Sequence, residues 1–214
     1  MRKLGTQVWS ALSIVALAGA GVAGCGSNGA SEDVAGAPRA KMGNAASPMT
    51  PAKAPANALP AGWETFTSKD GGYTVAAPGK LKTSAQQVKT AVGNIKMNMA
   101  LLSKENTAYL AIHADYPAVT LKADPQKILD GARNGAIKQM GASATGYKKI
   151  TINGFPGQEF SGTTKLENVP AFVTARIYLV RQRLYQQIVV GPEDEKSTKD
   201  IDLFFKSFKI QAKK

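Results

Sequence analysis

The chain has 214 residues, which is long enough for one domain with its own core plus additional segments. Basic residues outnumber acidic ones by 27 to 15, and this excess predicts either an anionic partner or a solvated basic surface. The single cysteine, Cys25, excludes an intramolecular disulfide and any zinc module rich in cysteine.

The first 24 residues have the pattern of an export signal. Met1-Arg2-Lys3 is followed by an uncharged run from Val8 to Ala18 and then by small residues, the order typical of a secretory signal. Glycines at positions 19, 21 and 24 match the dinucleotide-binding spacing G-x-G-x-x-G. No helix-forming pattern follows them, however, and no carboxylate stands near residue 44. We therefore reject a cofactor loop and predict that residues 1–24 are a signal peptide.

The residues Val22-Ala23-Gly24-Cys25 resemble a bacterial lipobox, in which an aliphatic and two small residues precede a cysteine. The resemblance implies cleavage before Cys25 and attachment of lipid to its thiol, and two or three acyl chains hold a protein on a membrane durably. The alternative is an ordinary signal with an accidental cysteine. A transmembrane anchor is disfavoured because residues 8–24 are too few and too rich in Gly and Ala.

The predicted location follows from this anchor. We expect an exported protein, lipid-anchored to the cell membrane, with its domain facing the periplasm or the exterior. Gly26 stands where enteric-type bacteria commonly place an Asp for retention in the inner membrane, so a cell with two membranes would carry the protein on the outer one.

Residues 25–61 are predicted to be the lipidated cysteine and a disordered linker. Residues 26–61 hold five of the 11 prolines and no aromatic residue. Such a segment cannot bury enough apolar surface to offset its ordering entropy, and its prolines favour extended conformations. We therefore expect a tether that holds the domain away from the membrane.

Residues 62–214 are predicted to form the domain, which starts with antiparallel strands. Two short runs around Phe66 and Tyr73 are separated by Lys69-Asp70-Gly71-Gly72, and this turn predicts a hairpin because its glycines adopt positive φ at little cost. A second hairpin is predicted around residues 92–94, between runs 82–90 and 95–104, and a further strand follows over residues 107–116.

A helix is predicted from Asp124-Pro125 to Gly141, with Asp as its cap, Pro at its first position and Gly as its stop. Gly131 and Gly135 lie inside this helix, and we expect them to allow close contact with the sheet. Strands then return over residues 147–152, 158–164, 171–181 and 183–191, the last two joined at Gln182 and Arg183 and placed at the sheet centre. The end of the domain, residues 193–210, is predicted to be a closing helix that buries its aromatic residues against the sheet.

This order predicts an α+β fold, a mainly antiparallel sheet flanked by helices. The segments F-x-S-x-D-G-G-Y-T-V-x-x-P, N-G-F-P-G-Q-E-F, ARIYLV…RLYQQIVVG and FFKSFKI resemble the PsbP/Mog1-type α/β/α sandwich, and in particular bacterial lipoproteins of uncharacterised function that carry it. The resemblance covers about residues 62–211. It implies the fold and no catalytic residue.

The residues offer little evidence for catalysis. His113 is the only histidine, and Asp115 two residues along the same strand could orient its imidazole, but no serine stands in a nucleophile elbow. We predict no catalytic residue, no metal site and no cofactor. The alternatives are a hydrolase-like envelope enzyme that uses His113, and a passive structural protein of the envelope.

The positive charge is the remaining indication of a partner. Along residues 183–190, Arg183, Tyr185 and Gln187 share one strand face, which is either a binding surface or the side that a helix covers. Export argues against nucleic acid. We therefore predict a non-enzymatic accessory module that binds a protein or an anionic envelope polymer, with the membrane reached through Cys25.

Overall fold

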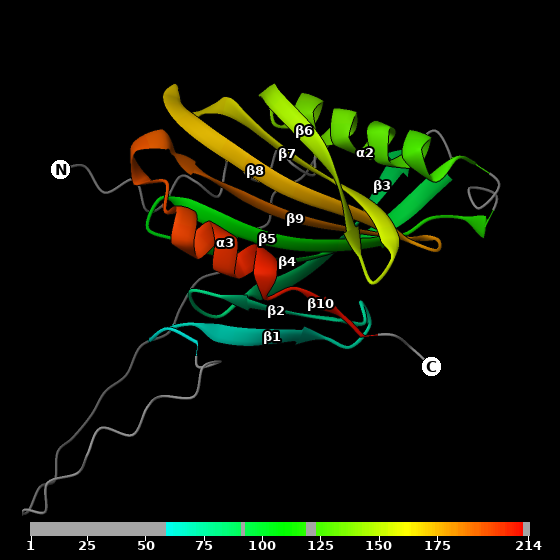
Figure 1. Ribbon diagram of the computed structural model, residues 1–214, viewed down its shortest axis with the longest axis horizontal. Helices are drawn as coiled ribbons and strands as arrows, with labels where there is room; N and C mark the ends of the chain where they lie inside the picture. Colours follow the sequence, from blue (N-terminus) through cyan, green and yellow to red (C-terminus); the bar gives the residue numbers. More distant parts are fainter. Residues whose placement is uncertain (1–58, 91–92, 119–122, 212–214) are drawn as a thin grey trace, which may run out of the picture. The chain divides into compact units, whose positions relative to one another are not determined.

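The computed structural model describes residues 59–90, 93–118 and 123–211 (Figure 1). The predicted signal peptide, the lipid attachment site Cys25 and nearly all of the predicted linker lie outside these residues. The described part is mostly antiparallel sheet with two α-helices, so the predicted α+β class is confirmed.

Seven strands form the main sheet, in the order β3-β4-β5-β9-β8-β7-β6 with every neighbouring pair antiparallel. Their bounds are β3 Lys82–Thr90, β4 Gly93–Lys104, β5 Thr107–Asp115, β6 Ser143–Ile152, β7 Phe155–Leu166, β8 Val169–Val180 and β9 Arg183–Pro192. Strand β9 is the fourth of the seven, which confirms the central place predicted for the long hairpin. Its turn is Arg181-Gln182, one residue earlier than predicted, and Arg181 adopts a φ of 57°.

A second, small sheet has three strands, β1 Glu64–Ser68, β2 Tyr73–Ala77 and β10 Lys209–Ile210, with β2 in the middle. The predicted first hairpin is confirmed as β1 and β2, which pair antiparallel across the turn at residues 69–72. Strand β10 was not predicted, because a strand of two residues has no readable period. The small sheet places the first and last strands of the domain side by side.

Each face of the main sheet is covered. Helix α2, Pro125–Gln139, packs on β7 and β8 on one face, and helix α3, Thr198–Lys206, and the small sheet cover the other, as Figure 1 shows. A short 3-10 helix, η3 Glu193–Glu195, precedes α3. Alternation along β9 explains the two layers: Leu184 and Ile188 join the core under α2, whereas Tyr185 and Val189 join the core under α3.

The helix ends follow the predicted chemistry. The Asp124 carboxylate accepts a hydrogen bond from the backbone N–H of Gln126 at 2.8 Å, and Gly141 adopts a φ of 56° just beyond α2. Ser197 caps α3 in the same way, and Phe204 and Phe205 are buried from that helix. Burying each of these rings contributes about 1.5–3 kcal/mol.

One prediction about α2 was wrong. Gly131 and Gly135 do not face the sheet: both are exposed, and a Cβ added at either position would meet no heavy atom within 4 Å. The apolar positions Leu129, Ala132 and Ala136 form the packed stripe, and the glycines lie outside it.

Candidate functional site

The strand face that carries Arg183, Tyr185 and Gln187 contacts other parts of the domain. Tyr185 and Gln187 are buried, with the Tyr185 hydroxyl donating to the Gly71 carbonyl at 2.8 Å and the Gln187 amide donating to the Phe204 carbonyl at 3.1 Å. This face is therefore the side that α3 and the small sheet cover, and the alternative of an open binding surface was wrong.

Arg183 binds the turn of the small sheet. Its Nη1 donates to the backbone carbonyls of Asp70 at 2.8 Å and Gly71 at 3.1 Å, while its other nitrogens hold the Asp115 carboxylate. The β1–β2 turn is thereby attached to the main sheet at the end of β5 and β9. The Asp115 carboxylate forms an ion pair with Arg183, and its charge also acts on His113, whose pKa it raises.

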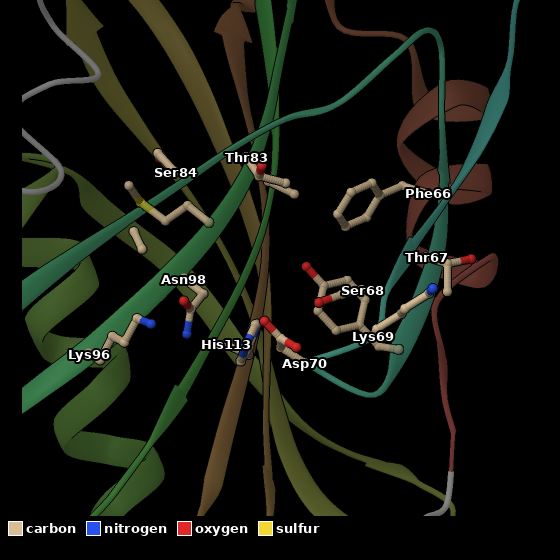
Figure 2. Close-up of a pocket in the computed structure, with 14 residues that line it drawn as sticks. Phe66, Thr67, Ser68, Lys69, Asp70, Thr83, Ser84, Lys96, Asn98 and His113 are labelled. Carbon is tan, nitrogen blue, oxygen red and sulfur yellow. The ribbon is translucent and has the colours of Figure 1, made fainter.

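A pocket of about 640 Å³ opens beside this turn. It lies between the small sheet and strands β3 and β4 of the main sheet, and Ala85 and Ala100 of these strands contribute only methyl groups to its lining. The lining residues are Phe66, Thr67, Ser68, Lys69, Asp70, Tyr73, Thr83, Ser84, Ala85, Lys96, Asn98, Met99, Ala100 and His113. In Figure 2, Lys96 and Asn98 approach from one side and Phe66, Ser68 and Lys69 from the other, with Asp70 and His113 between them.

His113 forms part of the pocket wall. It lies on β5 directly opposite Asn98 of β4 and Tyr185 of β9, and the Tyr73 ring packs edge-on against it at 5.8 Å between ring centroids. The side chain is only 4% exposed, and its Nδ1 has no hydrogen-bond partner among the described residues. A buried polar atom without a partner costs about 1–3 kcal/mol, so the Nδ1 of His113 is a destabilising feature of this wall.

The charge around the pocket is mixed, with two ammonium groups and one carboxylate. Lys69, Lys96 and Asp70 are exposed, and in the described part of the chain none of the three forms an ion pair. Burial lowers the pKa of His113 below its ordinary value, and the positive charge of Arg183 lowers it further. His113 is therefore a neutral imidazole at pH 7, with one nitrogen that donates and one that accepts.

Several basic residues that suggested a partner are neutralised within the domain. Lys148 and Arg176 both bind the Glu159 carboxylate, and Arg176 also stacks over the Phe205 ring at 4.8 Å. These hydrogen bonds and charges hold the pKa of Glu159 below its usual range, although burial alone would raise it. This cluster stabilises the sheet, whereas Lys69 and Lys96 line the pocket beside the β1–β2 turn.

A second polar cluster joins α2 to the sheet. The amide of Gln158, fully buried on β7, accepts from Arg133 at 2.9 Å and donates to Asp130 at 2.7 Å. The hydrogen bond from Gln158 is the main reason that the pKa of Asp130 is lowered. Both charged residues lie on α2, so the cluster is a structural attachment.

The sequence did not reveal the pocket, because its residues come from the β1–β2 turn and from five different strands, β1 to β5. One signal was present. Lys96 and Asn98 alternate with Ile95, Met97 and Met99, which predicts that the two polar side chains share one strand face.

The described residues contain neither a cluster of metal-ligating side chains nor a helix that could span a membrane. Across residues 59–211, apart from the gaps, His, Asp and Glu nowhere gather in threes at a spacing suited to a metal ion. The helices in that same part of the chain are too short or too polar to span a bilayer.

Comparison with known proteins gives distant structural likeness alone. No protein-family model matches the chain, and no curated protein matches it in sequence. The chain is similar in structure to cyanobacterial PsbP from Synechocystis sp. PCC 6803, with a TM-score of 0.49 and 14% identity over 73% of this chain and 96% of that one. It is also similar to LpqN of Mycobacterium tuberculosis, a protein involved in cell envelope biogenesis, with a TM-score of 0.46 and 13% identity over 70% of this chain and 91% of that one. Likeness at this level carries nothing about activity.

Proposed function

We propose that the protein is a lipid-anchored envelope lipoprotein whose domain is a non-enzymatic accessory module. Residues 1–24 serve as its signal peptide, Cys25 carries its lipid and residues 26–61 tether the domain outside the membrane that holds it. The PsbP/Mog1-type resemblance is compatible with this proposal. The binding site of the module is the pocket between the β1–β2 hairpin and strands β3 and β4.

One observation carries the binding role. The lining of a solvent-open pocket includes Lys69 from the β1–β2 turn and Lys96 from β4, and neither forms an ion pair in the described part of the chain. Two exposed ammonium groups at one cavity attract an anionic ligand, which supports a role in holding one.

Crosslinking in intact cells tests the binding role. A photoreactive amino acid at Asn98, in the pocket, should give a reproducible adduct with an envelope component. The same group at Lys138, exposed on α2 on the opposite face of the sheet, is the matched control. If the two positions give the same products or none, the pocket is not the binding site, and a passive structural role is favoured.

The anchor has its own test. Labelled palmitate should enter the wild-type protein and not Cys25→Ser, and detergent should be needed to release only the wild type from membranes. Labelling that survives the substitution rules out Cys25 as the lipid attachment site.

The enzyme alternative has one supporting observation, the neutral imidazole of His113 beside the pocket. His113→Ala separates the two functions: a folded variant that keeps the cellular phenotype excludes an enzyme that depends on His113.

A further inference from the structure

We infer that the pocket binds an acidic sugar, a ring that carries several hydroxyl groups and one carboxylate. This inference rests on the proposed binding function and names the chemical class of the ligand. The hydrogen-bonding groups, charges, apolar contacts and size of the pocket all fit such a ligand.

The lining is suited to hydroxyl groups. Thr83 offers a hydroxyl that donates and accepts, Asn98 offers an amide that does both, and the Asp70 carboxylate accepts. The Ser68 hydroxyl already accepts the Gly71 N–H and can still donate. Sugar hydroxyls also donate and accept, so they can satisfy such a mixed set. An apolar ligand would leave these groups without partners at a cost in free energy.

The charges favour one anionic group on the ligand. Lys69 and Lys96 lie on opposite sides of the pocket (Figure 2), and in the described part of the chain no carboxylate lies within salt-bridge distance of either. Asp70 offsets only one of these charges, which leaves a net positive pocket. A ligand carboxylate restores neutrality, whereas a cationic ligand would meet two ammonium groups.

The apolar part of the lining fits the C–H face of a sugar ring. Phe66 is half-buried at the pocket wall, and in Figure 2 its ring extends from β1 toward the side of Thr83. The negative face of an aromatic ring attracts polarised C–H groups. A strongly hydrated inorganic anion has no such face.

The size of the pocket also fits a sugar. A volume of about 640 Å³ is that of a site for an organic ligand, and a lone ion would leave most of it unfilled.

Titration calorimetry on the full-length protein in detergent tests the inference with three probes. Glucuronate should bind, glucose should bind at least about tenfold more weakly because it has a hydroxymethyl group in place of the carboxylate, and inorganic phosphate should not compete. An oligomer of uronic acid distinguishes a polymer from a free sugar as the source: tighter binding than the monomer indicates the polymer.

Variants locate the binding. Lys96→Met should weaken glucuronate binding about tenfold and leave glucose binding unchanged, and Ala85→Trp should abolish both by placing a large ring in the pocket. Lys138→Met, on the far face, removes the same charge and should change neither. Circular dichroism checks that each variant is folded. A Lys138→Met effect equal to that of Lys96→Met overturns the inference, as does equal affinity for glucose and glucuronate.

The two proposals fail in different ways. If no sugar binds while the Asn98 crosslinker still captures a specific component, the ligand class is wrong and the binding function stands. If neither experiment detects binding at the pocket, both are wrong.

Discussion

Arg183 holds the carboxylate of Asp115 in a two-pronged ion pair, with its Nη2 2.7 Å from Oδ2. Hydrogen bonding to Asp115 is the main cause that raises the pKa of Arg183. The same guanidinium binds two carbonyls of the β1–β2 turn, so one side chain positions the hairpin that forms a wall of the pocket. Asp115 thus serves the fold through Arg183.

Replacing Arg183 by Lys should loosen this turn. An ammonium group cannot reproduce the planar fork, so we expect the free energy of unfolding to fall by about 1–2 kcal/mol. Urea denaturation measures it. Arg181→Lys, exposed in the β8–β9 turn, is the matched control and should change stability by less than about 0.5 kcal/mol. Equal effects of the two substitutions would show that the turn does not depend on Arg183.

Stability should depend on the protonation of His113. Its folded pKa is lowered, chiefly by burial and then by Arg183, against the opposing charges of Asp115 and Asp70, while Lys96 lowers it further. The unfolded chain therefore binds the proton more readily, and stability should fall as the pH drops below about 6.5 toward the folded pKa.

His113→Gln tests this dependence, because the chain has no other histidine. The free energy of unfolding at pH 7.5 minus that at pH 5.5 should be smaller in the variant than in the wild type. The same difference in both proteins contradicts the assignment to His113.

Removing the Gln158 side chain should detach α2 from the sheet. Gln158→Ala deletes its hydrogen bonds with Arg133 and Asp130 and leaves a cavity, so we expect a loss of about 2–4 kcal/mol. The pKa of Asp130 should rise toward its ordinary value, as carboxyl NMR titration can measure. Gln126→Ala, which removes a single 3.4 Å hydrogen bond to Asp130, should have the smaller effect on both quantities.

Two glycines should respond to alanine in opposite directions. Gly135→Ala on the open side of α2 should stabilise the protein by about 0.5–1 kcal/mol, because alanine loses less backbone entropy in a helix and meets nothing. Gly157→Ala should destabilise it by about 1–3 kcal/mol, because the new Cβ would lie 2.6 Å from the Ile177 carbonyl oxygen. Thermal melts compare the two. A lower melting temperature for Gly135→Ala would mean that the open space beside it is needed.

The sequence predicted correctly those elements whose ends are set by capping and turn residues. The Asp124 cap and the Gly141 stop define α2, and the Gly71-Gly72 turn defines the first hairpin, because each depends on the backbone preferences of adjacent residues. The sequence did not predict strand β10, and the expected orientation of Gly131 and Gly135 toward the sheet was wrong. Both features depend on which distant segment packs against these residues.

The sequence by itself determined the order and type of the main elements, since period-two and helical patterns are properties of short segments. It also carries the prediction of export and of lipid on Cys25, which lies outside the described residues. Only the tertiary structure decided that the Arg183, Tyr185 and Gln187 face is covered, and that Lys69, Lys96 and His113 meet at one pocket. Strand pairing and sheet stacking create these contacts between distant residues, and the alternation within one strand cannot tell a covered face from an open one.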